Sequence, residues 1–272
     1  MRNKQFSLVT VINTLTFFFG VLIGGYLFEI VGIVWGRYLS YIISSFIALW
    51  FVKDYYRTFV NVKIPNKEQR QDFLKFSIVS MLSNSISQIL YLLDTFIIGI
   101  IIQSGIVVAS YKTATLIPFA LNFIPSSVMT FAYPYFAKHK DDKNLVKNYF
   151  LKLQKYLLLF NLVISILLIV FAPFVIRVIF GPEYLDSVLP FRILSFGYLI
   201  AGTFRIPVGN IIASLKKVKV NFYNSIISGG ANIVLDIILI KNYGPVGAAV
   251  ATVVVFVISS FVSNIYLRKY LK

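Results

Sequence analysis

A row of polar side chains runs along Phe73–Gln103, a stretch that is otherwise apolar and long enough to cross a bilayer as a helix. Spacings of three and four residues place the members of this row on one helical face: Ser77, Ser80, Asn84, Ser87, Tyr91 and Asp94. Gln88 widens the same face. Polar residues in a membrane span usually face a protein interior or a water-filled space. We therefore expect Asn84, Gln88 and Asp94 to line a cavity.

Asp94 is the costliest residue of this stretch, because it lies about eight residues, or roughly 12 Å, below the expected outer end of the helix. A bare carboxylate at that depth is strongly unfavourable, so the group must be neutral, hydrated or paired. Two interpretations stay open. In the functional interpretation, Asp94 is a proton or cation site or part of a gate. In the structural one, it accepts a hydrogen bond from a neighbouring helix.

Arg205 lies in a later apolar stretch, near the expected middle of the membrane. Glycine and proline surround it, which predicts an open or bent backbone: Gly197, Gly202, Pro207 and Gly209. Arginine cannot lose its proton to avoid the cost of burial, and its guanidinium binds phosphate in a bidentate manner. Arg205 is therefore expected either to contact a phosphate-bearing ligand or to form a structural ion pair, for which Asp94 is a candidate.

A second polar helix is expected over Val107–Ala137, where Lys112 stands near the start and Asn122 near the middle. Prolines interrupt this helix at three positions: Pro118, Pro125 and Pro134. Proline removes a backbone hydrogen bond and kinks a helix, and the freed carbonyls need water or polar side chains. We expect this helix to be bent and to line the same wet space. The alternative is ordinary helix packing, which also tolerates proline.

Two further charged residues lie near expected outer helix ends. Arg192 is a candidate for the cavity, although a long cationic side chain at an interface can also extend to the headgroups. Asp236 is expected to be solvated.

The whole chain has the composition of an all-α, polytopic membrane protein. Of 272 residues, 58% are hydrophobic and only 13% are charged, and apolar runs of about 20 residues recur along the chain. Eight transmembrane helices are expected: Phe6–Phe28, Ile33–Val52, Phe73–Ile102, Val107–Ala137, Tyr149–Phe180, Val188–Leu215, Phe222–Ile240 and Val246–Leu267.

The net charge of +16 reflects basic connections between these helices and not one basic patch, which disfavours nucleic acid as a partner. Most Lys and Arg residues fall at the two termini and in the connections 53–75, 138–155 and 216–219. This bias predicts that both termini are cytoplasmic and that membrane lipids are partners. The sequence has no cysteine, no metal-ligand spacing, no phosphate-binding glycine loop and no catalytic triad pattern. We expect neither an enzyme nor a cofactor.

A faint internal repeat relates the second expected helix to the last. Ile43-Ser44-Ser45-Phe46 recurs 215 residues later as Ile258-Ser259-Ser260-Phe261, and the same offset places Gly32 on Gly247. Parallel repeats of six-helix units are a known transporter plan. The repeat predicts that residues 1–60 hold the last two helices of an N-terminal lobe. Residues 61–72 would be a cytoplasmic linker, and residues 73–272 would form a complete six-helix C-terminal lobe.

Several short motifs, in order, resemble those of polysaccharide flippases of the O-antigen type. The polar helix Phe73–Ile102 ends with Asp94 and Ile98-Gly99, and the next one begins with Tyr111, Ala114 and Pro118. Phe180-Gly181-Pro182-Glu183-Tyr184 and Gly244-Pro245-Val246-Gly247-Ala248-Ala249 also resemble family elements. On these residues the chain resembles the multidrug/oligosaccharidyl-lipid/polysaccharide exporter superfamily.

The resemblance implies two six-helix lobes around a cationic cavity in the bacterial cytoplasmic membrane. It also implies export of undecaprenyl-pyrophosphate-linked polysaccharide repeat units by alternating access, with Arg205, Arg192 and Lys112 as candidates to meet the pyrophosphate. Four helices of the first lobe would be missing from this chain, and a partner chain is one candidate to supply them. Two alternatives stay open: a cation-coupled multidrug exporter of the same superfamily, and a truncated membrane subunit without autonomous transport.

Overall fold

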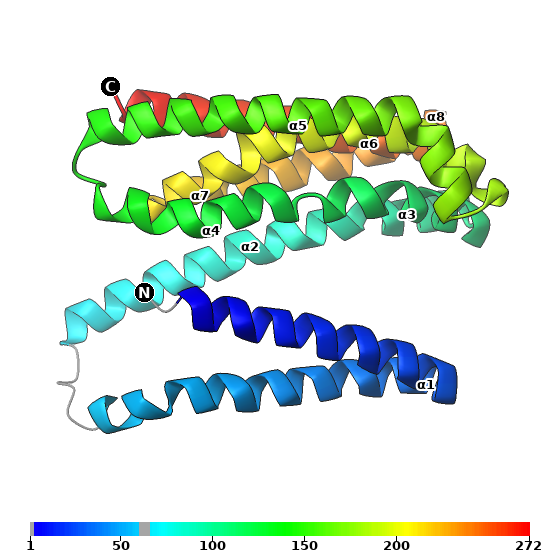
Figure 1. The fold of residues 1–272 in the computed structure, drawn as a ribbon. Helices are drawn as coiled ribbons and strands as arrows, with labels where there is room; N and C mark the ends of the chain where they lie inside the picture. The colour runs from blue at the N-terminus through cyan, green and yellow to red at the C-terminus, as the bar shows by residue number, and fades with distance from the viewer. Residues whose placement is uncertain (1–2, 60–65) are drawn as a thin grey trace. The chain divides into compact units, whose positions relative to one another are not determined.

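The computed structural model describes residues 3–59 and 66–272, and these residues form helices joined by short connections, with no strand among them (Figure 1). The expected all-α class is therefore confirmed. The chain divides into two compact units, Met1–Lys67 and Glu68–Lys272.

The first unit contains one helical segment, α1 (Asn3–Phe59), which folds back on itself. The reversal lies at Phe28 (φ −136°, ψ 19°) and Glu29 (φ 50°, ψ −133°), whose backbone angles are not helical. Glycines let the two arms touch, because a Cβ atom on Gly32 would collide with the backbone of Gly24. Farther from the turn, the Ser44 hydroxyl donates a hydrogen bond of 2.9 Å to Oδ1 of Asn13 across the arms.

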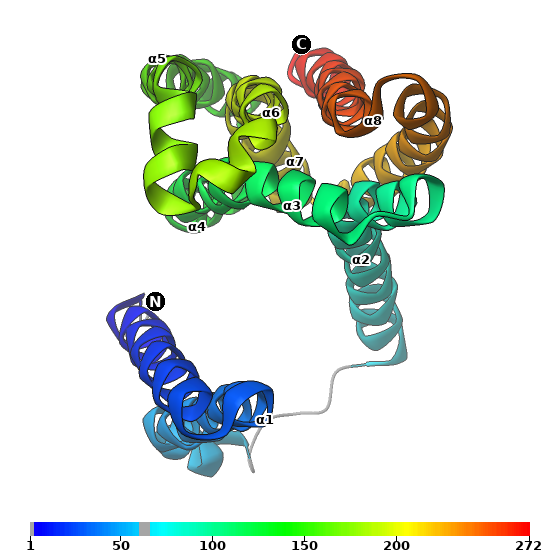
Figure 2. The same cartoon turned by 90° about the vertical axis from the view of Figure 1, so that its right-hand side faces the viewer.

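The second unit begins with the long helix α2 and ends with the bent helix α8 (Figure 2). Its elements are α2 (Lys67–Ile102), α3 (Gly105–Ala120), α4 (Phe123–Lys138), α5 (Lys143–Ile179), the 3-10 turn η1 (Pro182–Ser187), α6 (Val188–Ile200), the π turn η2 (Ala201–Arg205), α7 (Ile206–Ser214) and α8 (Val218–Tyr270).

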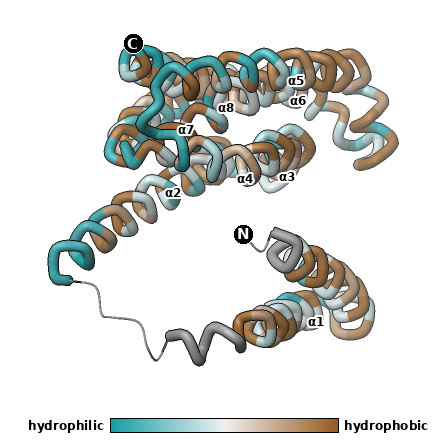
Figure 3. The backbone as a smooth tube through the Cα atoms, turned by 60° about the vertical axis from the view of Figure 1, so that its left-hand side comes forward, coloured by the Kyte–Doolittle hydropathy of each residue, from teal (hydrophilic) through white to brown (hydrophobic). Residues whose placement is uncertain are grey.

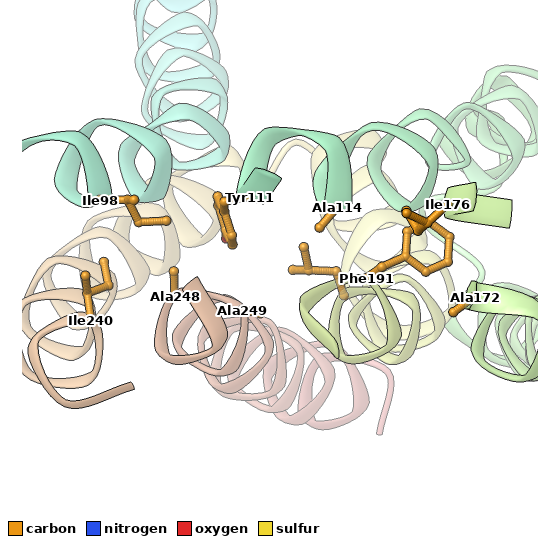
Figure 4. Packing of buried hydrophobic residues seen from close by; sticks show 10 residues of the cluster. Ile98, Tyr111, Ala114, Ala172, Ile176, Phe191, Ile240, Ala248 and Ala249 are labelled. Carbon is orange, nitrogen blue, oxygen red and sulfur yellow. The ribbon is translucent and has the colours of Figure 1, made fainter. Parts of the chain in front are cut away.

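Two buried apolar clusters hold this second unit together. In the first, Ile98 of α2, Tyr111 of α3 and Ala248 of α8 gather on one side, with Phe191 of α6 farther along (Figure 4). The second joins α4, α5, α7 and the end of α8 through Met129, Phe136, Phe150, Ile211 and Leu267, among others. The side chains in these clusters are almost fully buried, so they fix the helices that surround the site described below.

The proline-rich helix expected over Val107–Ala137 is interrupted, as predicted. It forms α3 and α4, separated by a short turn at Leu121 and Asn122. Pro125 lies in the first turn of α4 and has no N–H with which to continue the hydrogen-bond ladder across the turn.

The bend expected around Arg205 is a π turn. The N–H of Ile206 reaches the carbonyl of Ala201, five residues back, and Pro207 follows at once without an N–H of its own. The π turn ends on Arg205, so the irregular backbone lies at the residue that sequence analysis singled out.

The turn inside α8 has the same backbone form as the turn inside α1. Gly244 takes φ 57° and ψ −137°, close to the values of Glu29, and these two residues lie 215 positions apart. A Cβ on Gly247 would collide with the backbone of Leu239, as one on Gly32 would with Gly24. Both pairs also differ by the same offset of 215. The backbone geometry of the two turns therefore supports the internal repeat.

The apolar helices identify a multi-pass membrane protein. Five helices in the described part are long and apolar enough to cross a membrane, or six if the two bent segments of α2 form one span. The helices α1 and α8 count once each in this number, although both are bent at non-helical residues. The expected number of eight stays a prediction. Figure 3 shows hydrophobic colour along α1 and α5 and hydrophilic colour at the start of α2 and near the C-terminus.

Candidate functional site

A polar cavity of about 710 Å³ lies in the second unit. The helix α2 and the α3–α4 pair supply part of its wall, and the π turn, α7 and both arms of α8 supply the rest. Most lining side chains carry a hydroxyl or an amide: Ser80, Ser83, Asn84, Ser87, Gln88, Asn122, Ser126, Asn210, Asn221, Asn224, Ser225, Ser259 and Ser263. Among the described residues that line this cavity, the charged ones are Arg205 and Lys112.

The predicted polar face of α2 is one wall of this cavity. Asn84, Gln88 and Tyr91 line it, and so do Lys112 and Asn122 from the helices that follow. The polar residues that share one face of α2 by their spacing therefore lie together in the cavity wall.

Arg192 and Asp94 lie outside the lining, in contrast to the prediction. Nε of Arg192 donates a hydrogen bond of 3.1 Å to the carbonyl of Ile169, and its side chain is exposed. Asp94 is only 2% exposed and is enclosed by other side chains. The face of α2 continues past the end of the cavity, and Asp94 belongs to that continuation.

Arg205 points its guanidinium between the cavity and two aromatic rings. Nη1 donates a hydrogen bond of 2.9 Å to the hydroxyl of Tyr91, and Nε donates one of 3.4 Å to Oγ of Ser259. The guanidinium carbon lies 5.0 Å from the ring centroid of Phe256 and 5.6 Å from that of Tyr91, within cation–π range. All of these partners are neutral, so the positive charge of Arg205 is not cancelled by them.

The alternative pairing of Arg205 with Asp94 does not occur. Oδ2 of Asp94 accepts a hydrogen bond of 2.7 Å from the hydroxyl of Tyr111 and a second from the hydroxyl of Thr252. Oδ1 accepts one of 3.3 Å from Nδ2 of Asn232. Helices α2, α3 and both arms of α8 thus meet at this carboxylate.

Asp236 joins the same cluster, which corrects the expectation that it is solvated. Its side chain is fully buried, and no hydroxyl, amide or cationic side chain of the described residues donates a hydrogen bond to its carboxyl oxygens. The carboxyl group of Asp94 is within hydrogen-bond reach when one of the two carboxyl groups carries a proton. Asp236 lies one helical turn after Asn232 and close enough to Asp94 for the two carboxyl groups to interact electrostatically. We call Asp94, Asp236 and their neighbours Tyr111, Asn232 and Thr252 the acidic cluster.

A buried carboxylate without a donor is costly, and a bound proton or cation removes that cost. The acidic cluster offers two carboxyl groups together with amide and hydroxyl oxygens, which are the ligand types that hard cations prefer. The part of the chain that the structure describes contains no group of three or more His, Cys, Asp or Glu residues placed to hold a metal ion.

A small second cavity lies between Arg205 and the acidic cluster. Its walls include Tyr91 and Arg205 on one side and the Asp94 partners Asn232 and Thr252 on the other. Its volume is about 10 Å³, enough for about one water molecule. Tyr91 and Arg205 line both cavities, so they form the partition between the polar cavity and the acidic cluster.

Sequence reasoning missed Asn232, Asp236 and Thr252 as members of a site. The signal that could have found the first two is their spacing of four residues, which puts two polar groups on one face of an apolar helical arm. The position of Thr252 on the second arm of α8 follows only from the turn at Gly244.

A family model described as "Polysaccharide biosynthesis protein" matches residues 1–189. The chain belongs to this polysaccharide biosynthesis family. The match confirms the resemblance to polysaccharide flippases that the motifs predicted.

Solved structures of membrane transporters and of a flippase have the same fold. A MATE transporter of Vibrio cholerae aligns with 98% of this chain and 62% of its own, with a TM-score of 0.80 and 15% identity. The lipid II flippase MurJ, in an inward closed conformation, aligns with 96% of this chain and 55% of its own, with a TM-score of 0.66 and 20% identity. A MOP superfamily transporter of Pyrococcus furiosus aligns with 72% of this chain and 44% of its own, with a TM-score of 0.63 and 20% identity.

The chain spans only part of these relatives. It covers 44–62% of the three solved transporters. A curated relative, an uncharacterized membrane protein of Methanocaldococcus jannaschii, is 31% identical over 90 residues, which are 33% of this chain and 18% of that protein. The similarity to the solved structures shows that this chain shares their fold.

Proposed function

We propose that this chain forms part of a flippase for lipid-linked oligosaccharides, whose substrate is an undecaprenyl-pyrophosphate-linked polysaccharide repeat unit. The observation that carries the proposal is Arg205, a guanidinium held by neutral partners at the wall of a polar cavity. A guanidinium whose partners are all neutral keeps its full charge and is suited to bind a pyrophosphate through charge-assisted hydrogen bonds. Lys112, the other cation of the wall, would share this role.

The remaining wall suits the sugar part of such a substrate. Hydroxyl and amide side chains both donate and accept, as sugar hydroxyl groups do. Aromatic rings add apolar surface at Phe76, Phe119 and Tyr133. A cavity of about 710 Å³ is also within the usual range for a ligand site.

We further propose that the acidic cluster binds the coupling ion, a proton or a monovalent cation. Asp236 supports this role because its carboxyl group is buried beside that of Asp94 and receives no hydrogen bond from a hydroxyl, amide or cationic side chain of the described residues. An ion bound there would neutralise negative charge on Asp94 of α2 and Asp236 of α8. Ion binding would then favour the conformation in which these two helices are in contact.

The charge of the cavity favours an anionic cargo over the cationic drugs of a multidrug exporter. The charged groups of the wall, within the described ranges, are an arginine and a lysine. A cationic drug would be repelled by both, whereas a pyrophosphate would be attracted.

For the complete transporter we propose two lobes, with residues 1–60 in the N-terminal lobe, 61–72 as the linker and 73–272 as the C-terminal lobe. The matching turns at Glu29 and Gly244 support this repeat. The other helices of the first lobe would come from an upstream segment or a partner chain. Both termini would be cytoplasmic and the membrane would be the bacterial plasma membrane, in line with the basic connections.

The test is glycan export by the complete transporter with Arg205→Ala, in cells that lack their own flippase. We expect surface glycan to fall at least about tenfold, because a charge-assisted contact to the pyrophosphate is lost. Arg192→Ala is the matched control, since this arginine lies outside the cavity and should leave export unchanged. Full export by Arg205→Ala would exclude the proposed anion site.

A further inference from the structure

The π turn Ala201–Arg205 is contacted from two helices by amide side chains that do not line the polar cavity, one of them buried and the other half-buried. On one side stands Asn161 of α5, and on the other stands Asn264 of α8.

Asn161 is fully buried and packs against the side of the turn. Its Nδ2 donates a hydrogen bond of 3.2 Å to Oγ1 of Thr203, the central residue of the turn. Its Oδ1 accepts one of 2.7 Å from the hydroxyl of Tyr198, which fixes the orientation of the amide. The contact is close, because a Cβ on Gly202 would lie 2.9 Å from the same Nδ2.

Asn264 contacts the turn from α8. Its Nδ2 donates a hydrogen bond of 2.9 Å to the carbonyl of Phe204, the residue before Arg205. Its Oδ1 accepts one of 3.0 Å from Nε2 of Gln154. Gln154 and Asn161 both belong to α5, so α5 contacts the turn directly and also through α8.

We propose that Asn161, Asn264 and Gln154 are positioning residues that hold this segment as a π turn and thereby direct Arg205 into the polar cavity. A π turn contains one residue more than the α-helical turn it replaces. If the turn relaxed to α-helix, the residues on one side of it would rotate by about 100° relative to the other. The guanidinium of Arg205 would then leave Tyr91 and Phe256 and no longer face the cavity.

The proposal has two parts. The claim that the amides position Arg205 for anion binding rests on the proposed function, whereas the claim that they stabilise the π turn does not. Two measurements test the two claims separately. Both use the full chain, purified in detergent.

The first measurement is hydrogen exchange of the backbone amides at residues 201–206. Thr203→Val keeps the shape of the side chain and removes the acceptor for Asn161, and Asn264→Ala removes the donor to Phe204. We expect faster exchange across the turn in both variants. Ser165→Ala is the matched control, because Ser165 also makes a buried hydrogen bond from α5 to α6, of 2.8 Å to the carbonyl of Ser195, but does not contact the turn. Exchange at 201–206 that is equal in all variants would overturn the proposal.

The second measurement is calorimetric binding of inorganic pyrophosphate. Thr203→Val and Asn264→Ala should weaken binding by about three- to tenfold, the effect of one hydrogen bond, while Ser165→Ala stays within about twofold of the wild type. In an Arg205→Ala background the same two substitutions should have no further effect, because they act through Arg205. Equal weakening in that background would show that the amides do not act through Arg205 and would overturn their positioning role. If Arg205→Ala alone left pyrophosphate binding intact while exchange in the turn rose, the proposed function would fail and the hold on the turn would stand.

Discussion

The hydroxyl of Tyr91 accepts a hydrogen bond of 2.9 Å from Nη1 of Arg205, although the two residues are 114 positions apart in the chain. Tyr91 lies on the polar face of α2 and Arg205 at the end of the π turn, so the bond joins the two features that stand out in the sequence. Both side chains also line the small cavity that leads to the acidic cluster.

Removing the Tyr91 hydroxyl should loosen Arg205. In Tyr91→Phe the ring remains and one hydrogen bond is lost, so pyrophosphate binding should weaken by a few-fold. Tyr91→Ala also removes the cation–π contact and should weaken binding further. Calorimetry of the purified chain measures both effects. Tyr133→Phe is the control, because Tyr133 lines the same cavity. If Tyr133→Phe and Tyr91→Phe weakened binding equally, the contact with Arg205 would not be responsible.

Binding of an ion at the acidic cluster should raise thermal stability in the wild type. An ion at 100 times its dissociation constant contributes about 2.7 kcal/mol, which corresponds to a rise in Tm of roughly 5–10 °C for a protein of this size. Asp236→Asn should abolish most of this rise, because the amide carries no charge for the ion to neutralise. The measurement is thermal unfolding in sodium, potassium or choline chloride at fixed ionic strength, at two pH values.

The control for this experiment is Asp186→Asn, which changes an exposed aspartate on η1. It should keep the full response to the ion. A response in Asp236→Asn as large as in the wild type would place the ion elsewhere.

The two turns of the repeat should tolerate a methyl group equally poorly. In Gly32→Ala and Gly247→Ala the new Cβ would collide with the backbone of the opposite arm, and we expect a loss of about 1–3 kcal/mol or more in each. Gly230→Ala is the control, because nothing lies within 4 Å of a Cβ there and alanine favours helix. Thermal unfolding gives the comparison, and a neutral Gly247→Ala would contradict the close approach in α8.

The orientation in the membrane can be tested with single cysteines, because the natural chain has none. A membrane-impermeant maleimide added to intact cells should label Glu29→Cys, at the turn of α1, and should label Lys269→Cys only after the membrane is permeabilised. Labelling of Lys269→Cys in intact cells would reverse the proposed orientation.

The polar wall of α2, the interruption of the helix at Pro125 and the irregular backbone at Arg205 could be predicted from the sequence, because each has a local cause. Spacing along one helix places Asn84 and Gln88 on a common face, and glycine and proline act on their own turns. The acidic cluster could not be predicted in the same way. Whether Asp236 is solvated or buried depends on how α8 packs against other helices, and its neighbour Asp94 lies 142 positions away on α2.

The partner of Arg205 is a similar case. A mid-membrane arginine requires compensation, but the sequence alone could not choose between a carboxylate, a hydroxyl and an aromatic ring. The packing of α2 against α8 places the rings of Tyr91 and Phe256 beside the guanidinium and so determines its partners.

In the wall of the polar cavity, α2 contacts α8 through three serine hydroxyls. Oγ of Ser225 lies 3.3 Å from Oγ of Ser83 and 3.2 Å from Oγ of Ser87, and in both pairs either group can donate. A hydroxyl can exchange one such partner for another, or for water, at little cost, whereas interlocked apolar side chains resist sliding. At this part of the interface the contacts between α2 and α8 can therefore be exchanged one at a time, whereas the apolar packing of Ile98 and the hydrogen bonds of Asp94 hold the same two helices together farther along.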